Sequence, residues 1–333
     1  MSTVPGAPLT KTAPVLEIEG LGVRLAADRA ARPILDGVSL TVRPGETVGL
    51  VGESGSGKSV ACRSVLGLLP AGARTDGEVR VAGRDVLAMN RAELTALRAR
   101  QVSMVFQDPR ASVNPLRRVG DFLTEGLRAA GTPAAAATAR AEELLDAVGI
   151  RDPRGALRRR PHEFSGGMLQ RVVIAAALAS EPALLVADEP TTALDVTTQA
   201  EVISILARLR AERGTGMLFV THDLELAATV CDRVYVMYAG RIVETRSTDE
   251  LFDLPRHPYT AGLLACTPRI EAGAAAPRPI PGRPVSLAEA PSGCSFAARC
   301  AHALPRCAEE APALAPHGDG LAACHRAEEG IVL

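Results

Sequence analysis

Apolar runs of strand length alternate with amphipathic runs of helical length through most of the chain between residues 15 and 255. The strand-length runs are at residues 47–51, 102–106, 183–187 and 217–220, and the helical runs are at residues 60–69, 91–100, 119–130, 133–148, 172–179 and 198–213. Alternation of this kind predicts an α/β fold built on a mainly parallel sheet.

Other segments carry β signals of a different kind. Residues 15–25 alternate polar and apolar side chains well enough for one or two edge strands, and residues 34–42 and 77–83 predict further short strands. Residues 234–243 predict a closing hairpin. These segments predict short strands in addition to those of the parallel sheet.

Changes in composition divide the chain into a tail, a core with an insert, and an extension. Residues 1–14 are predicted to be a disordered tail, and residues 15–255 form the core domain, with a helical insert at about 108–164. Residues 256–333 form a small cysteine-rich C-terminal extension. Within it, the Ala-, Pro- and Gly-rich segment 272–293 is predicted to be a linker.

Charge and hydropathy exclude several classes of protein. The 333 residues carry a net charge of −1, which gives no field suited to polyanions, so nucleic acid is not an expected partner. No segment resembles a signal peptide, and the longest apolar run, residues 172–187, is too short and too polar to span a bilayer. We therefore expect a cytosolic or membrane-peripheral protein, whose seven cysteines are not first interpreted as disulfides.

A glycine-rich loop lies between the strand run 47–51 and the helical run 60–69. It reads G-x-x-x-x-G-K-S and consists of Gly52, Glu53, Ser54, Gly55, Ser56, Gly57, Lys58 and Ser59, with Val60 in the helix after it. Such P-loops turn backbone N–H groups toward phosphate oxygens at a helix N-terminus. Lys58 would reach the β- and γ-phosphates, and Ser59 would ligate Mg²⁺. A chance match is a poor explanation, because Lys11 is the only other lysine in the chain.

Two carboxylates end the apolar run 183–187. Asp188 is placed to hold Mg²⁺ beside the phosphates, as Walker B aspartates do, and Glu189 to act as general base for an attacking water. A strand that ends in a solvated acidic loop is the simpler interpretation of this pair alone. The P-loop upstream favours the catalytic interpretation.

Four weaker signals complete the pattern, each of which is more often structural when it occurs alone. They are Gln107 after the run 102–106, Ser165-Gly166-Gly167 before a helix, Ala193-Leu194-Asp195 after the carboxylates, and His222 after the run 217–220. The amide of Gln107 could reach Mg²⁺ or water, and the Ser-Gly-Gly backbone could present N–H groups to phosphate. His222 is placed to contact a γ-phosphate.

In this order the motifs resemble those of the ATP-binding subunits of ABC transporters, and the resemblance covers roughly residues 15–255. It implies an ABC-type P-loop NTPase core with a parallel sheet, an antiparallel β subdomain and a helical insert. It also implies that the chain is an ATPase with ATP and Mg²⁺ as ligands. The implied Mg²⁺ ligands are Ser59, Gln107 and Asp188; the implied catalytic residues are Glu189, Lys58, His222 and Gln107.

The same resemblance implies a head-to-tail dimer with two ATP molecules between its subunits. The motif Ser165, Gly166, Gly167 and Met168, with Asp195, would complete the ATP site of the partner. The helical insert would receive the coupling helices of membrane subunits.

Two positions depart from the family pattern. Met168 stands where glutamine is commonest, which removes an amide but keeps the backbone donors. Leu25 aligns with the aromatic residue that usually stacks on adenine, so the roughly 0.5–1.5 kcal/mol of aromatic pairing beyond area burial would be lost. Selectivity for the base is therefore in question.

Four cysteines lie in the last forty residues, and no two of them have the C-x₂₋₄-C spacing of common zinc sites. They are Cys294, Cys300, Cys307 and Cys324. The spacing alone leaves zinc, an iron–sulfur cluster and unrelated thiols open. Cys62, Cys231 and Cys266 have apolar neighbours and are interpreted as core or incidental thiols.

Residues 255–264, 279–282 and 293–300 resemble the C-terminal extension of oligopeptide/dipeptide-type importer ATPases. This resemblance implies a [4Fe–4S] cluster on the four cysteines, with zinc as the alternative. It also implies a paralogous second ATPase subunit, two membrane permease subunits and an extracytoplasmic substrate-binding protein, at the cytoplasmic face of the plasma (inner) membrane. The rival prediction is a soluble ABC ATPase that acts on ribosomes or DNA without a transporter; a lesser rival is an exporter.

Overall fold

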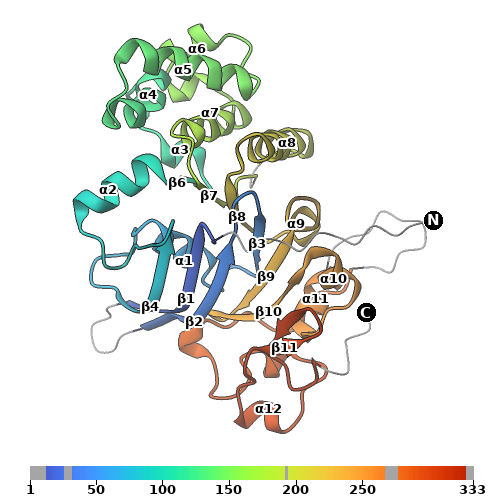
Figure 1. Cartoon of the computed structure of the whole chain (residues 1–333). Coiled ribbons are helices and arrows are strands. Elements are labelled where there is room, and N and C mark those ends of the chain that lie inside the picture. The colour runs from blue at the N-terminus through green and yellow to red at the C-terminus, as the bar shows by residue number, and fades with distance from the viewer. Residues whose placement is uncertain (1–12, 26–31, 192–193, 267–276, 328–333) are drawn as a thin grey trace, which may run out of the picture.

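The computed structural model describes residues 13–25, 32–191, 194–266 and 277–327. A large sheet lies in the middle of the molecule, with a smaller antiparallel sheet beside it (Figure 1). The helical insert lies at one end of this pair of sheets and the C-terminal extension at the other.

The large sheet has eight strands in the order β11-β12-β10-β9-β3-β8-β7-β6. The five strands from β9 to β6 run parallel, which confirms the α/β prediction. Their side chains are almost all buried, as in parallel strands that helices cover on both faces. The bounds are Thr47–Val51 for β3, Val102–Val105 for β6, Leu184–Asp188 for β7, Gly216–Thr221 for β8 and Arg233–Tyr238 for β9.

The smaller sheet has the order β2-β1-β4-β5 and is antiparallel. Its strands are β1 (Leu16–Leu25), β2 (Arg32–Val42), β4 (Arg74–Val81) and β5 (Arg84–Asp85). The prediction of an edge strand at 15–25 is wrong, because β1 lies between β2 and β4, with Leu16 opposite both Val42 and Val81. Alternation along one strand carries no information on how many neighbours it has.

Four core helices lie close to their predicted places: α1 (Lys58–Val65), α2 (Arg91–Arg100), α7 (Gly166–Leu178) and α8 (Val196–Arg213). Two more, α9 (Leu224–Val230) and α10 (Thr248–Asp253), were not predicted. α1 is shorter than the run 60–69 suggested, because Gly67 adopts a left-handed conformation with φ of 62°. The insert holds α3 (Pro109–Ser112), α4 (Val119–Ala129), α5 (Ala134–Ala147), α6 (Pro153–Arg158) and the 3₁₀ turn η1 (Pro161–Glu163).

The extension is packed into the same core as the sheet. It contains α11 (Pro258–Cys266), η2 (Leu287–Glu289), η3 (Ala297–Arg299), α12 (Arg306–Glu309), β11 (Ala315–His317) and β12 (Gly320–Ala322). Tyr259, Leu264 and Phe296 belong to the hydrophobic cluster that includes β7 and β8.

The extension also changes two predictions. β10 (Arg241–Ser247) forms the expected hairpin with β9, but the hairpin does not close the sheet, because β12 pairs with β10. Of the predicted linker 272–293, residues 272–276 lie outside the described residues. Ile280, Val285 and Ala290 in the rest of it pack against the core cluster, so this part is not a free linker. The predicted tail lies outside the described residues up to residue 12.

Candidate nucleotide-binding site

The P-loop joins the end of β3 to the start of α1 and needs glycine at two positions. Gly52 has φ of 154°, and a Cβ there would lie 2.2 Å from the carbonyl oxygen of Met237. Gly57 has φ of 107°, and its Cβ would lie 2.6 Å from Leu35. A side chain at either position would therefore displace the loop from the sheet.

Lys58 is buried at the centre of this loop, with 5% of its surface exposed. Its Nζ donates to the carbonyl oxygens of Gly52 at 2.6 Å and Glu53 at 3.0 Å. Burial lowers the pKa of Lys58, while the nearby carboxylates of Glu189 and Asp188 oppose that shift. The loop thus holds a cation at the place where the sequence predicts phosphate oxygens.

Asp188 lies at the end of β7, next to the first turn of α1. The hydroxyl of Ser59 donates to its Oδ1 at 3.3 Å. Burial raises the pKa of Asp188, and the hydrogen bond from Ser59 opposes this effect. Two of the three predicted Mg²⁺ ligands, Ser59 and Asp188, are therefore adjacent, and their hydroxyl and carboxylate oxygens suit a hard cation.

Glu189 brings two further predicted residues into contact. Gln107 Nε2 donates to Glu189 Oε2 at 2.9 Å, and His222 Nδ1 lies 3.4 Å from the same oxygen. Glu189 has φ of 48°, an uncommon conformation for a non-glycine residue, and its N–H donates to the carbonyl of Val220 at 3.0 Å. Since parallel strands end at one edge of the sheet, residues from β3, β6, β7 and β8 meet there.

The remaining predicted residues form a second, separate group, which we call the signature segment: Ser165, Gly166, Gly167 and Met168, with Asp195. Ser165 is the N-cap of α7 and accepts from the N–H of Met168 at 3.3 Å. Asp195 is the N-cap of α8, and hydrogen bonds from the backbone and side chain of Thr198 lower its pKa.

The signature segment lines a cavity of about 650 Å³ that also contains Arg159 and Arg171. Two P-loop residues, Glu53 and Ser54, line a different cavity of about 640 Å³, together with Gln107, Glu189 and His222. One chain therefore does not bring all the predicted ligands of a nucleotide into one place.

Leu25 ends β1 and is half-buried against the core beside the smaller sheet. Residues 26–31, which come next in the chain, lie outside the described residues. The predicted contact of Leu25 with adenine stays a prediction.

The sequence did not indicate two residues that touch the P-loop from the extension. The hydroxyl of Tyr259 accepts from the N–H of Glu53 at 2.8 Å, and the guanidinium of Arg299 pairs with the Glu53 carboxylate. Leu263, Cys266, Pro279 and Ile280 line the wall of the cavity that holds Glu189. No sequence pattern signals these contacts, because they join segments 206 and 246 residues apart.

Two of the four cysteines of the extension are directly joined, because the N–H of Cys294 donates to the carbonyl oxygen of Cys307 at 2.8 Å, and neighbouring cysteines add to the raised pKa of Cys300 and Cys324. Backbone N–H groups of His302, Leu304 and Arg326 lie 3.3–3.4 Å from the sulfurs of Cys300, Cys307 and Cys324. Burial raises the pKa of Cys294, Cys300 and Cys324. Among the described residues, no three His, Cys, Asp or Glu side chains are close enough to hold a metal ion, so the predicted cluster is not confirmed.

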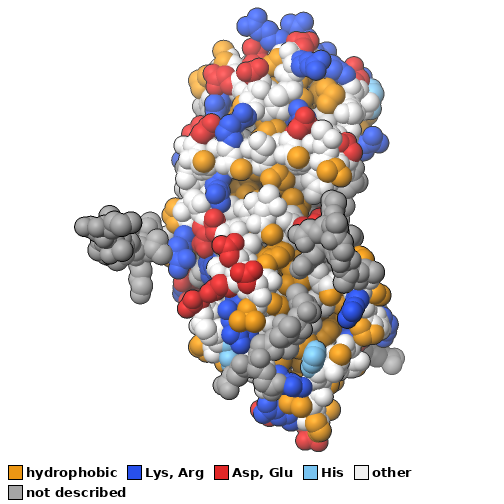
Figure 2. All heavy atoms as spheres, turned by 90° about the vertical axis from the view of Figure 1, so that its right-hand side faces the viewer, with side chains coloured by type: hydrophobic (Ala, Val, Ile, Leu, Met, Phe, Trp, Pro, Cys, Tyr) orange, Lys and Arg blue, Asp and Glu red, His pale blue; other side chains and the backbone are white. Residues whose placement is uncertain are grey.

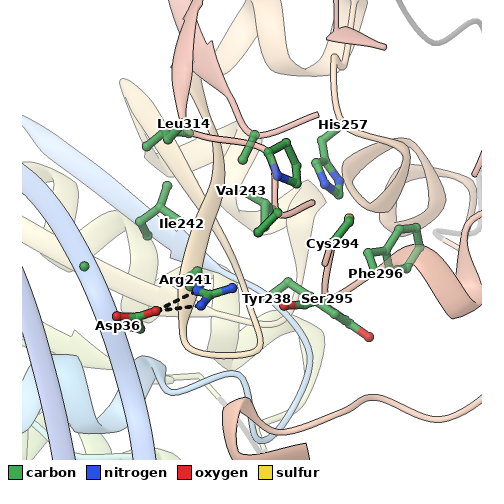
Figure 3. A pocket seen from close by; sticks show the side chains of 14 residues that line it. Asp36, Tyr238, Arg241, Ile242, Val243, His257, Cys294, Ser295, Phe296 and Leu314 are labelled. Atoms are coloured by element: carbon green, nitrogen blue, oxygen red, sulfur yellow. Dashed lines mark hydrogen bonds and ion pairs between the residues drawn. The ribbon is translucent and has the colours of Figure 1, made fainter. Parts of the chain in front are cut away.

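A cavity of about 190 Å³ separates this cysteine region from the β9–β10 hairpin (Figure 3). His257, Cys294 and Phe296 lie at one side of it, and the ion pair of Asp36 with Arg241 lies at the other. Cys62 and Cys231 are buried thiols elsewhere, as predicted, and Cys266 is partly exposed.

The described surface offers no extended basic region on the face in Figure 2, where acidic and basic side chains are interspersed and acidic ones gather near the middle. This agrees with the net charge of −1. In the described part of the chain, none of the helices has the length and apolar character that crossing a membrane requires.

Comparisons with known proteins identify the family of this chain. The family model described as ABC transporter matches residues 35–192, and the model described as the oligopeptide/dipeptide transporter C-terminal region matches residues 243–307. The chain is 44% identical, over 96% of its length and 95% of the relative's, to the oligopeptide transport ATP-binding protein OppD of Salmonella typhimurium. It is 43% identical, over the same shares of both chains, to the Escherichia coli protein of that name.

Solved structures show the same fold. The dimeric structure of the bacterial ABC transporter cassette MJ0796 has a TM-score of 0.63 and 26% identity, with 70% of this chain and 98% of that chain covered. The structure of cbiO1 from Clostridium perfringens has a TM-score of 0.62 and 26% identity, with 72% and 91% covered. The chain therefore belongs to the ATP-binding subunits of ABC transporters, in the oligopeptide/dipeptide family.

Proposed function

We propose that this chain is the ATP-hydrolysing subunit of an importer of oligopeptides or dipeptides. ATPase activity follows from its family. The observation that carries the proposal is the meeting of the P-loop, Asp188, Glu189, Gln107 and His222 at one edge of the sheet. The names of its relatives, oligopeptide transport ATP-binding proteins, supply the class of cargo.

Hydrolysis needs a bound phosphate chain, an oriented water and stabilised charge. The N–H groups of the P-loop and the ammonium of Lys58 bind the phosphates. Ser59, Asp188 and Gln107 would hold Mg²⁺, which neutralises charge on the β- and γ-phosphates when bound. Their side-chain oxygens suit this ion. In this structure the Nε2 of Gln107 donates to Glu189.

Glu189 then orients the water and accepts its proton. Its carboxylate accepts a hydrogen bond from the Gln107 amide, and His222 Nδ1 lies near the same oxygen. A γ-phosphate that attracts either side chain would therefore change the position and hydrogen bonding of the Glu189 carboxylate. This arrangement lets Gln107 and His222 report the presence of the γ-phosphate.

The separation of the signature segment from the P-loop supports action as a head-to-tail dimer, with the signature segment serving the partner's ATP. The solved cassette MJ0796, a relative in fold, is described as dimeric. We propose a paralogous second ATPase as that partner, with two permease subunits and an extracytoplasmic binding protein. The complex would place this chain peripherally at the cytoplasmic face of the membrane.

Reconstitution tests this function. The chain, reconstituted in vesicles with permeases, a second ATPase and a binding protein from the same genome, should support uptake of labelled oligopeptides only when ATP is supplied. Vesicles with Glu189→Gln are the matched control. Recovery of the chain with ribosomes or DNA, and never with permeases, would support the soluble rival and reject the importer.

We also propose that Cys294, Cys300, Cys307 and Cys324 hold a [4Fe–4S] cluster, with zinc as the alternative. Their thiols lie together, and backbone N–H groups near three sulfurs would stabilise thiolate ligands, as hydrogen bonds to cluster sulfurs do.

Metal analysis distinguishes these ligands. Protein purified without oxygen should be brown and contain iron and acid-labile sulfide, which Cys300→Ser removes. Colourless protein with one zinc ion per chain would reject the cluster.

A further inference from the structure

We propose that Arg299 and Tyr259 of the extension are positioning residues for the P-loop, and that they set its affinity for the phosphates of ATP through Glu53. This inference rests on nucleotide binding at the P-loop, as proposed above. It assigns to the extension a direct part in the ATP site, besides whatever its cysteines bind.

Arg299 holds the side chain of Glu53 in a two-pronged ion pair. Its Nη1 lies 2.6 Å from Glu53 Oε2 and its Nη2 lies 3.0 Å from Oε1. The Arg299 side chain is 5% exposed and that of Glu53 is 24% exposed, so water screens the pair weakly. The hydrogen bond with Glu53 is the main cause of the raised pKa of Arg299, which therefore stays charged.

Neighbouring groups fix the direction of the guanidinium. Nε of Arg299 donates to the carbonyl of Pro281 at 2.8 Å, and its Cζ lies 5.8 Å from the ring centres of both Tyr238 and Phe296. A planar fork with all these contacts cannot be reproduced by lysine, which offers one flexible point charge. These contacts thus fix the orientation of the Arg299 guanidinium toward Glu53, in addition to placing a positive charge beside the carboxylate.

Tyr259 holds the backbone of the same residue. Its hydroxyl accepts from the N–H of Glu53 at 2.8 Å, and the side chain has no exposed surface. The ring centre lies 4.6 Å from that of Tyr238 and 5.3 Å from that of Phe296, so its position is set by packing. The peptide unit between Gly52 and Glu53 is therefore fixed from outside the loop.

Glu53 passes this restraint to the phosphate-binding lysine. Its carboxylate and N–H are held by the extension, and its carbonyl accepts from Lys58 Nζ at 3.0 Å. All three polar groups of one P-loop residue are thus engaged. A loop held in its binding conformation loses less entropy when the phosphates arrive, so it binds them more tightly.

The test is binding of Mg²⁺ with the non-hydrolysable analogue AMP-PNP to the full-length chain, measured by calorimetry. We expect Arg299→Gln to raise the dissociation constant about tenfold and Tyr259→Phe about threefold. In the transporter complex, the same variants should raise KM for ATP while kcat changes less than twofold, because Asp188 and Glu189 lie on β7 and directly after it. Arg283→Gln, which removes an exposed ion pair with Glu289 in the same extension, should change neither.

A double-mutant cycle separates positioning from general loss of structure. If Glu53→Gln and Arg299→Gln act on one contact, the combined variant should bind no more weakly than the weaker single variant. Additive losses, or unchanged affinity in both Arg299→Gln and Tyr259→Phe, overturn the inference. Should Arg299→Gln fail to fold, Tyr259→Phe decides alone, since it removes one hydroxyl. Wild-type chain that does not bind the nucleotide would instead reject the P-loop assignment itself.

Discussion

In the proposed dimer the P-loop and the signature segment are the two halves of an ATP site, and this chain builds them differently. The P-loop lies against the ends of buried strands, Lys58 is 5% exposed, and Glu53 is held by residues from the far end of the chain. In the signature segment Ser165, Gly166 and Asp195 are exposed, and hydrogen bonds of Ser165 and Asp195 close local helix caps. The first half is organised within the chain, and the second is exposed, as its proposed contact with the ATP of a partner subunit requires.

The largest effect is expected in the P-loop half of the site, from substitution of the proposed general base Glu189. Glu189→Gln should keep nucleotide affinity within about threefold and lower kcat by roughly 10²–10⁴-fold, because it removes a positioned general base. Phosphate release by the reconstituted complex and AMP-PNP binding measure the two quantities. Undiminished turnover would remove Glu189 from this role.

Lys58→Ala should weaken nucleotide binding as well as lower kcat. If Leu25 stacks poorly on adenine, contacts of the P-loop with the phosphates supply most of the binding free energy. We expect the dissociation constant for Mg²⁺–AMP-PNP to rise by about 10²-fold, for loss of a buried cation facing phosphate. Unchanged affinity with lowered kcat would show that the adenine or the ribose supplies the binding energy instead.

Acid should weaken the contact between extension and core. Burial lowers the pKa of His257 to about 3, below its ordinary value of 6.5, so protonation favours the unfolded chain. The stabilisation is complete above pH 6.5 and is lost as the pH falls toward 3, by about 2 kcal/mol between pH 6.5 and 5. Denaturant unfolding at these pH values should show the loss in wild type and a smaller one in His257→Gln.

Ser165→Ala tests the second half. It should leave AMP-PNP binding by the isolated chain unchanged and lower turnover of the complex about tenfold, because this hydroxyl would serve the nucleotide on the partner. Weaker binding by the isolated chain would show that Ser165 contacts the nucleotide bound to its own P-loop, and the two halves would then belong to one site within the chain.

Much of this arrangement could be predicted from local pattern. The runs ending at Val51, Val105 and Asp188 marked parallel strands, and the carboxyl ends of parallel strands lie at one edge of a sheet, so Lys58, Gln107 and Asp188 were predictable as neighbours. The contacts of Tyr259 and Arg299 with Glu53 could not be predicted, because no local sequence pattern indicates a contact with a residue more than 200 positions away. The neighbours of β1 and β10 escaped prediction for the same reason, since pairing depends on the whole fold.

The pairing of β12 with β10 has a consequence for folding. Glu244 of β10 lies opposite Ala322, so one edge of the central sheet stays open until residues 320–322 have been synthesised. Contacts between such distant segments form late, and an unpaired strand edge is a template for aggregation in the meantime. Premature termination just before β12 would therefore leave a chain with an intact P-loop sequence and an exposed strand, more prone to self-association than the full-length protein.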